Sequence, residues 1–174
     1  MNRVLIALGL AALTVLGACE KIKDLLNFSI ANESSFTVSS TTPINSPYTI
    51  NTPDVTTNSS QEFENNNTNA KLVKEVKLKS LTLTITNPSQ QNFNFLKTIR
   101  IYISSTNSNE IELASLESVP AGVSSIVLTP TNSRLDEYIK ADKYSLRTEV
   151  VTDEVLTHDV SLRCNSVFSV AANL

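Results

Sequence analysis

The sequence has few of the residues from which enzyme active sites are usually built. It contains no tryptophan, one histidine, two cysteines and three glycines among 174 residues. A Ser-His-Asp hydrolase would need His158 as its base, and the chain has no Gly-x-Ser-x-Gly turn to present a nucleophilic serine. A zinc site needs several histidine or cysteine ligands, and a phosphate loop needs clustered glycines. We therefore expect no enzyme activity, no catalytic residues, no metal and no cofactor, with His158 a surface residue beside Asp159.

The charges give no sign of a nucleic-acid partner. The chain carries 14 Lys and Arg against 17 Asp and Glu, for a formal charge of −3, and no basic block of the kind that binds phosphates. Carboxylates are paired at Glu110 and Glu112, at 136–137 and at 153–154. A glycosidase needs two carboxylates facing each other across the substrate, but solvated surfaces explain these pairs more simply. The 153–154 pair lacks the Asp-x-Asp-x-Asp spacing of a calcium loop.

The N-terminus has the pattern of a secretory signal. Arg3 is the only charged residue before Glu20, and residues 4–16 are almost wholly apolar. A membrane-spanning helix needs about 20 apolar residues, so this run is too short to be one. A positive start, a short apolar core and small residues after it predict a signal peptide at 1–18, which is removed. The alternative, a buried N-terminal helix, is disfavoured because every face of the stretch is apolar.

Residues 16–19 (Leu-Gly-Ala-Cys) resemble the lipobox of bacterial lipoproteins. In that family a dedicated signal peptidase cuts before the cysteine, here between Ala18 and Cys19. The cysteine sulfur then carries a diacylglycerol, and its amine is usually acylated as well. The resemblance implies that Cys19 is the lipidated first residue of the mature chain. One acyl chain binds a membrane only marginally, but each buried methylene contributes about 0.8 kcal/mol, so two or three chains would anchor the protein permanently.

The mature chain is long enough for one domain with its own core. Removal of 18 of the 174 residues leaves 156, and loss of Arg3 takes the formal charge from −3 to −4. Glu20, Lys21 and Asp24 resemble a signal that some Gram-negative groups use for export to the outer face of the outer membrane. We expect a bacterial cell-envelope protein whose lipid-anchored N-terminus is 19–27. The outer membrane is its expected location, with the periplasmic and surface faces both left open.

An Asn/Ser/Thr-rich segment separates the N-terminus from the rest of the chain. Between 32 and 69 these three residue types make up more than half of the sequence, and such a composition buries little apolar surface. Two interpretations of 28–70 stay open. It is either a spacer that lifts a domain at 71–174 off the membrane, or a set of irregular edge strands and loops of that domain. Short alternating pieces support the second interpretation, namely 28–30 and 36–38.

From Leu72 onward, apolar and polar residues alternate as in strands with one solvated face. The apolar residues change from even to odd positions near Lys79 and Ser80, which predicts a β-bulge there. In a second strand the odd positions are apolar: Phe93, Phe95, Ile99, Ile101 and Ile103. In the last strand the even positions form the buried column: Val160, Leu162, Cys164, Ser166, Phe168, Val170 and Ala172. Cys164 is therefore predicted to be a buried, unreactive thiol with a raised pKa.

Strands dominate the remaining sequence, with one short helix near 134–140. Ser133 followed by Asp136 resembles a capping box, and the apolar residues after it share one helical face. Further alternating segments occur at 111–113, 126–128 and 144–150. Many strands separated by turns, without alternating strands and helices, predict an all-β fold. We expect an antiparallel β-sandwich of the fibronectin or immunoglobulin type.

Two stretches of the domain are similar to the water-stress type of late-embryogenesis-abundant domain. They are residues 81–88 (LTLTITNP) and 119–122 (VPAG), with a strand between them and another after them. Domains of that family are fibronectin-like β-sandwiches without catalytic activity. The resemblance implies the same fold and a non-enzymatic role here. The Asn-rich segment before residue 71 is where the chain departs from the family.

Three hypotheses about function follow from these patterns. The favoured one is a lipid-anchored, non-enzymatic envelope protein that works by binding or as a scaffold, with a protein or a glycan as possible partner. The second is a carbohydrate-binding accessory lipoprotein of a glycan-uptake system, with Tyr102 and Tyr48 as possible contacts. The third is a hydrolase with an unrecognised site. An open row of aromatic side chains would favour the second hypothesis, and two convergent carboxylates in a cleft would favour the third.

Overall fold

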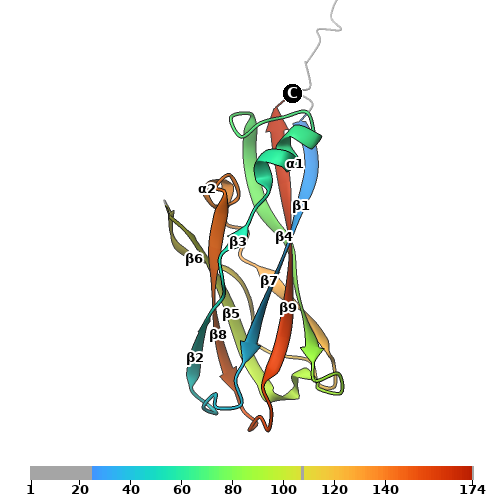
Figure 1. Ribbon diagram of the computed structural model, residues 1–174, viewed down its shortest axis with the longest axis vertical. Helices are drawn as coiled ribbons and strands as arrows, with labels where there is room; N and C mark the ends of the chain where they lie inside the picture. Colours follow the sequence, from blue (N-terminus) through green and yellow to red (C-terminus); the bar gives the residue numbers. More distant parts are fainter. Residues whose placement is uncertain (1–24, 107, 174) are drawn as a thin grey trace, which may run out of the picture.

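The computed structural model describes residues 25–106 and 108–173. The predicted signal peptide, its cleavage site and Cys19 lie outside these described residues. Nine strands, two α-helices and one 3₁₀ helix make up the body (Figure 1). In chain order they are β1 Leu25–Val38, β2 Pro47–Asn51, β3 Val55–Thr56, α1 Ser59–Asn65, β4 Val73–Asn87, η1 Phe93–Phe95, β5 Leu96–Ser105, β6 Ser108–Leu116, β7 Ser125–Pro130, α2 Asp136–Ile139, β8 Lys143–Thr152 and β9 Val160–Asn173.

The strands form one curled antiparallel sheet that folds over on itself into two layers. The strand order is β1-β9-β4-β7-β6-β5-β8-β2, and β3 pairs with β8 beside this path. β7 joins the layers, because residues 125–128 pair with β4 and residues 129–130 pair with β6. Figure 1 shows the resulting elongated body, with both layers running along its long axis. The predicted all-β, antiparallel architecture is confirmed.

The core lies between the two layers and follows the alternation seen in the sequence. All seven even-numbered residues of β9 from Val160 to Ala172 are buried, as predicted. Phe168, in the middle of this column, packs edge-to-face on Tyr144 of the opposite layer with ring centroids 6.1 Å apart. Burial of the apolar side chains of this column, with those of the other strands, stabilises the fold by about 25 cal/mol per Å² of apolar surface removed from water.

The predicted bulge in β4 is confirmed. The register of β4 against β9 shifts between Leu78 and Ser80. Val76 and Leu78 are buried before the shift, and Leu81, Leu83 and Ile85 are buried after it. The extra residue lets one strand keep its apolar side chains on the core side although their parity changes.

Two local predictions were wrong. Phe93 and Phe95 are buried as expected, but they lie in the 3₁₀ helix η1 and the strand begins only at Leu96. The cause is Asn92, whose side chain accepts a hydrogen bond from the Asn94 backbone at 3.0 Å and so turns the chain. The helix near 134–140 exists as α2, but Ser133 does not cap it, because Leu135 occupies the cap position and the Ser133 hydroxyl pairs with that of Thr131.

The segment 28–70, left open by the sequence, contributes β1, β2, β3 and α1 to the body. β1 is a continuous edge strand that begins at Leu25, so residues 25–27 of the expected tether are part of the sheet. The helix α1 was not predicted. It lies against β1 through Phe63, which is buried and meets the Phe28 ring edge-to-face at 6.2 Å.

Truncating Phe168 tests the central column. We expect Phe168→Ala to lower the free energy of unfolding by about 3–5 kcal/mol, because a fully buried ring is lost and the two layers cannot collapse into the space. Denaturant unfolding monitored by circular dichroism measures this. Val127→Ala is the control, since Val127 is 62% exposed and its truncation is expected to cost no more than about 0.5 kcal/mol. Equal losses for the two variants would contradict this view of the core.

Candidate functional site

Tyr102, the outward tyrosine of the carbohydrate hypothesis, lies on the outer face of the layer formed by β2, β8, β5 and β6. It is directly opposite Arg147 of β8. The Arg147 guanidinium lies 4.0 Å from the centre of the Tyr102 ring, a cation–π contact. One face of the ring is therefore covered by a charged side chain and is closed to a stacking sugar.

Arg147 also fixes the nearest carboxylate. Its guanidinium donates three hydrogen bonds of 2.7–3.1 Å to Glu110 of β6. These hydrogen bonds, which outweigh partial burial, hold the pKa of Glu110 below its usual value. A glycosidase acid needs a raised pKa, so this arrangement opposes a general-acid role for Glu110. Of the two carboxylates at 110 and 112, that of Glu110 is thus engaged in an ion pair on the sheet surface.

The structure does not bring Tyr48 and Tyr102 together. Tyr48 of β2 is opposite Val150 of β8, which is buried, so its side chain lies on the inner side of the layer. There it is half-buried and packs against the core. Tyr102 is on the other face of the same layer. The two rings therefore cannot form one platform for a glycan.

His158 lies on the surface and Cys164 lies in the core. His158 is exposed, with its ring nitrogen Nδ1 2.9 Å from the Thr157 hydroxyl. The neighbouring Asp159 carboxylate accepts hydrogen bonds from the backbone N–H and the hydroxyl of Ser40, at 2.7 and 3.0 Å. These bonds hold the pKa of Asp159 below its usual value and orient it toward Ser40. Cys164 is fully buried, and burial raises the pKa of its thiol.

The remaining acidic residues do not gather into a metal site in the described parts of the chain. Asp153 and Glu154 are exposed and border a surface hollow of about 480 Å³ together with Glu117. Nevertheless, residues 25–106 and 108–173 contain no group of three or more His, Cys, Asp or Glu residues arranged to hold a metal ion. Within the same residues, no helix has the length and apolar character needed to cross a bilayer.

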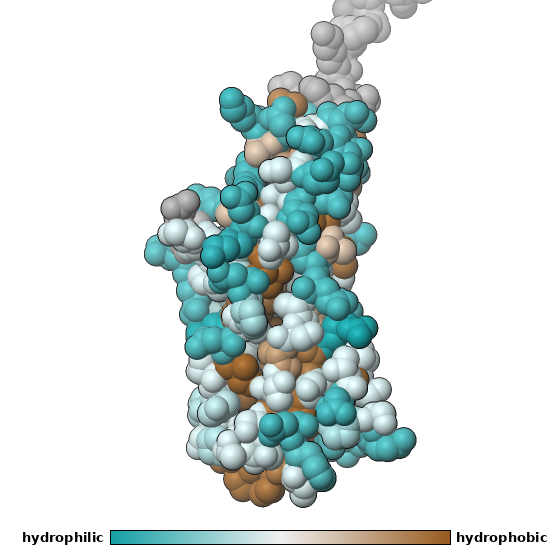
Figure 2. All heavy atoms as spheres, viewed as in Figure 1, coloured by the Kyte–Doolittle hydropathy of each residue, from teal (hydrophilic) through white to brown (hydrophobic). Residues whose placement is uncertain are grey.

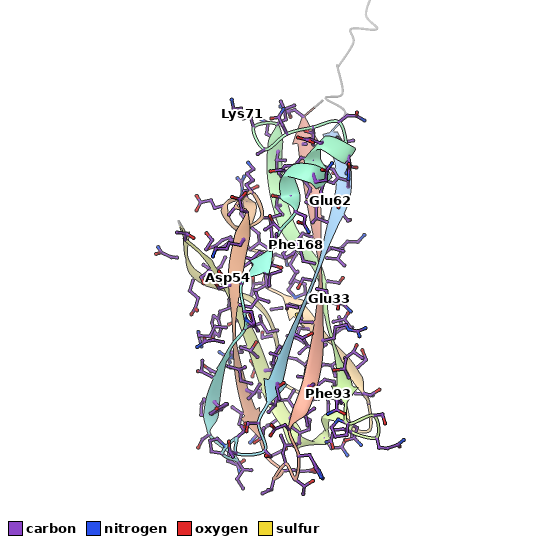
Figure 3. The ribbon with its side chains drawn as sticks, in the orientation of Figure 1. Glu33, Asp54, Glu62, Lys71, Phe93 and Phe168 are labelled. Atoms are coloured by element: carbon purple, nitrogen blue, oxygen red, sulfur yellow. The ribbon has the colours of Figure 1, made fainter. Side chains whose placement is uncertain are left out.

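The feature that sequence analysis missed is a gap between the two edges of the curled sheet. The edge strand β1 and the segment 53–56, which contains β3, border a cavity of about 260 Å³ at residues 33–35. We call this gap the seam. Figure 2 shows apolar atoms exposed between the hydrophilic surfaces on this side of the molecule, and Figure 3 places Glu33 and Asp54 on its two sides.

The seam is open because the middle of β1 has polar residues where the pattern calls for apolar ones. The inward positions Ile30, Phe36 and Val38 are buried, but Asn32 and Ser34 between them are half-buried. The amide of Asn32 donates a hydrogen bond of 3.3 Å to the Tyr144 hydroxyl, so a side chain and not a backbone ladder spans the gap. This interruption also made β1 look like two short strands in the sequence.

Asp54 is held in place on the opposite side of the seam. Its carboxylate accepts hydrogen bonds of 2.6 Å from Lys143 Nζ and from the Ser145 hydroxyl. The hydrogen bond from Lys143 and then that from Ser145 hold the pKa of Asp54 below its usual value, so the group stays ionised at neutral pH. Glu33 is 60% exposed, and its carboxylate lies 3.5 Å from the Arg163 guanidinium. Each wall of the seam therefore carries one carboxylate, and each carboxylate is paired with a basic side chain.

The Glu110–Arg147 pair makes a pH-dependent contribution to stability. Its side chains are 38% and 27% exposed, so after solvent screening we expect Glu110→Gln to lower the free energy of unfolding by only about 0.5 kcal/mol at pH 7. Because the folded-state pKa of Glu110 is lowered, this difference is present above its ordinary pKa of 4.5 and disappears as pH falls through the folded-state value. Denaturant unfolding of both proteins between pH 3 and 7 measures it.

The control for this experiment is Glu154→Gln, because Glu154 is exposed and takes part in no ion pair among the described residues. Its effect is expected to be within error at every pH. A difference for Glu110→Gln that persists at acid pH would contradict an electrostatic origin.

Comparison with known proteins identifies no relative. No protein-family model matches the chain, and no curated protein matches it. Among solved structures, a chain of Desmodium yellow mottle tymovirus is 13% identical with a TM-score of 0.29 and covers 86% of this chain and 89% of its own length. A chain of turnip yellow mosaic virus is 12% identical with the same TM-score and covers 84% and 96%. Likenesses this weak support no inference about fold or function.

Proposed function

We propose that this protein is a bacterial cell-envelope lipoprotein whose β-sandwich works by non-enzymatic binding or as a scaffold. The observation that carries the proposal is the lipobox-like sequence at 16–19, which ends a signal-like segment. Its cysteine, Cys19, is the proposed site of lipidation. The outer membrane is the proposed location, based on the charged residues that follow Cys19.

The position of β1 supports this arrangement. β1 begins at Leu25, six residues after Cys19, so the link between lipid and body reaches at most about 20 Å. β1 has 14 residues and is about 46 Å long at about 3.3 Å per residue. The chain would thus pass from its lipid anchor almost directly into β1. The body would extend away from the anchor, and the long sides of the sandwich would face other envelope components.

The surface chemistry favours a protein partner over a glycan. The candidate tyrosines lie on opposite faces of one layer, and Arg147 covers a face of Tyr102. At the seam, residues 32–36 of β1 form no backbone hydrogen bond to a described segment other than β9, and such strand edges bind peptide backbones. Binding through this surface is therefore part of the proposal, and sugar stacking is not.

The anchor is tested by replacing its cysteine. We expect Cys19→Ala to lose all acyl mass from the protein, because no other acylated group would be present, and to keep residues 1–18, because the peptidase of the lipobox family cuts before the cysteine. Mass spectrometry of the intact protein measures both effects. Cys164→Ala is the matched control, since it removes the buried thiol and leaves the lipobox intact. Acyl mass on the Cys19→Ala protein would refute a lipid tether at this residue.

Thiol counting gives a second, independent test. In the natural protein we expect a thiol reagent to label no cysteine under native conditions and one cysteine per chain in denaturant. The first result follows from the complete burial of Cys164 and its raised pKa, and the second from a thioether at Cys19. Two labelled thiols in denaturant would show a free sulfur at Cys19, and native labelling would show that Cys164 is accessible.

A further inference from the structure

Four lysines gather at the end of the body where β1 begins. We call them the β4 lysines, and they lie just before β4 and in its first half: Lys71, Lys74, Lys77 and Lys79. Leu25, the first residue of β1, is opposite Asn173 of β9, and the Asn173 backbone donates a hydrogen bond of 2.9 Å to Leu72. Figure 3 shows Lys71 at this end of the molecule. The proposed link from Cys19 therefore meets the body beside the β4 lysines.

The β4 lysines are exposed along the outer face of the layer formed by β1, β9 and β4. Lys77 is opposite Ser169 of β9, which is exposed, and the Lys77 side chain is itself 38% exposed. Lys74 and Lys79 are the extra residues where the register of β4 against β9 shifts, and both are exposed. Lys71, in the turn before β4, is exposed as well. Three of the lysines thus lie on one face, with Lys71 at its end.

This positive charge is not balanced on the same face. Glu75 pairs with Lys77 at 2.8 Å. The other charged residues on the outer face of these three strands, Glu33 and Arg163, lie 3.5 Å from each other. The segment 134–140 beside β4 carries two basic and two acidic residues, which cancel. Within the described residues, the other three β4 lysines take part in no ion pair, so their charge is available to an anionic partner.

The acidic residues at the same end lie on the other side of the sheet. They are Glu62 and Glu64 of α1, a helix that lies against β1 through the contact of Phe63 with Phe28. Phe28 is opposite Val170, a buried residue of the inner column of β9. The helix is therefore on the inner side of the layer whose outer face carries the β4 lysines, and this end of the body has a basic side and an acidic side.

We propose that the β4 lysines bind the anionic headgroups of the membrane that holds the lipid anchor, so that the outer face of the β1–β9–β4 layer leans toward that membrane. The link between Cys19 and Leu25 spans at most about 20 Å, which keeps this end of the body close to the membrane surface. Basic residues so placed are attracted to anionic lipids within about one Debye length, about 10 Å at 0.1 M salt. The inference deepens the proposed lipoprotein function and rests on its anchor.

The location favours a lipid surface over an acidic protein. The link holds the membrane beside the β4 lysines, so the membrane has a high effective concentration there. A protein partner would have to enter the narrow space between the body and the membrane. Lys74 and Lys79 are also about 15 Å apart along the strand, at about 3.3 Å per residue. A flat surface with many headgroups can contact both residues at once, whereas a single small anion cannot.

The test uses the purified mature lipoprotein, inserted from outside into preformed vesicles of phosphatidylcholine alone or of phosphatidylcholine mixed with phosphatidylglycerol. A membrane-impermeant amine reagent modifies the exposed lysines, and peptide mass spectrometry gives the rate for each. In the anionic vesicles we expect Lys71, Lys74 and Lys79 to react at least about threefold more slowly than in the neutral ones, because headgroups shield them. Raising the salt to about 1 M shortens the Debye length to about 3 Å and is expected to remove the difference.

Lys97 is the internal control for this measurement. It is exposed at the start of β5, next to Leu96, which is opposite Thr152 at the end of the body away from the start of β1 (Figure 1). Its rate is expected to be the same in both kinds of vesicle.

Charge variants separate a contact made by these lysines from mere nearness to the membrane. Lys79→Glu is expected to restore most of the lost reactivity of Lys71 and Lys74 in anionic vesicles, because it replaces an attractive charge with a repulsive one. Lys97→Glu, the same charge change at the other end of the body, is expected to leave their protection unchanged. Thermal melts confirm that both variants fold.

The inference is overturned if the β4 lysines react equally fast in both kinds of vesicle, if Lys97 is slowed as much as they are, or if the two variants have the same effect. Protection by a soluble polyglutamate peptide but not by anionic vesicles would assign the surface to an acidic protein and overturn the choice of the membrane. Intact mass, measured before insertion, reports acylation separately. An acylated protein without lysine protection contradicts only this inference, whereas a protein without acyl mass contradicts the proposed anchor as well.

Discussion

The pairing of β9 with two partners at once is the interaction on which the rest of the structure depends. β9 is matched to β1 along 14 residue pairs and to β4 on its other side, while its even-numbered side chains fill the space between the layers. Backbone hydrogen bonding and apolar burial are therefore concentrated in one strand. The position of β1, and with it the seam and the entry point of the chain, depends mainly on its ladder with β9, and α1 adds a contact near its start.

The sequence predicted correctly those strands in which one face is buried against the core along the whole strand. The column of β9 and the parity change of β4 are of this kind, because burial imposes a period of two that local sequence preserves. Phe93 and Phe95 share that spacing but are turned by the side chain of Asn92, an effect that hydrophobic alternation does not encode. The helix α1 has a single buried aromatic residue, Phe63, which is too weak a signal to find in a polar segment.

The candidate site was predicted only in part. The outward position of Tyr102 could be predicted from the alternation of apolar and polar residues. The guanidinium that covers its ring belongs to Arg147, 45 positions later in the chain, and this contact could not be predicted. The seam could not be predicted at all, because it depends on how far the curled sheet closes and on which strands remain at its edges. Polar residues at the inward positions 32 and 34 were the available signal. In the sequence these polar residues indicated a break between two short strands. In the structure they lie in one continuous strand, β1, beside the seam.

The two strands that share the longest ladder stand at opposite ends of the chain, since Leu25 is opposite Asn173 and Val38 is opposite Val160. Contacts so distant in sequence form late and slow folding. If the chain crosses a membrane N-terminus first, β1 emerges before β9, and the two strands cannot pair until residues 160–173 have emerged. During that interval its whole length is available to other chains, so a factor that shields newly exported strands would matter more for this protein than for one whose neighbouring strands pair in order.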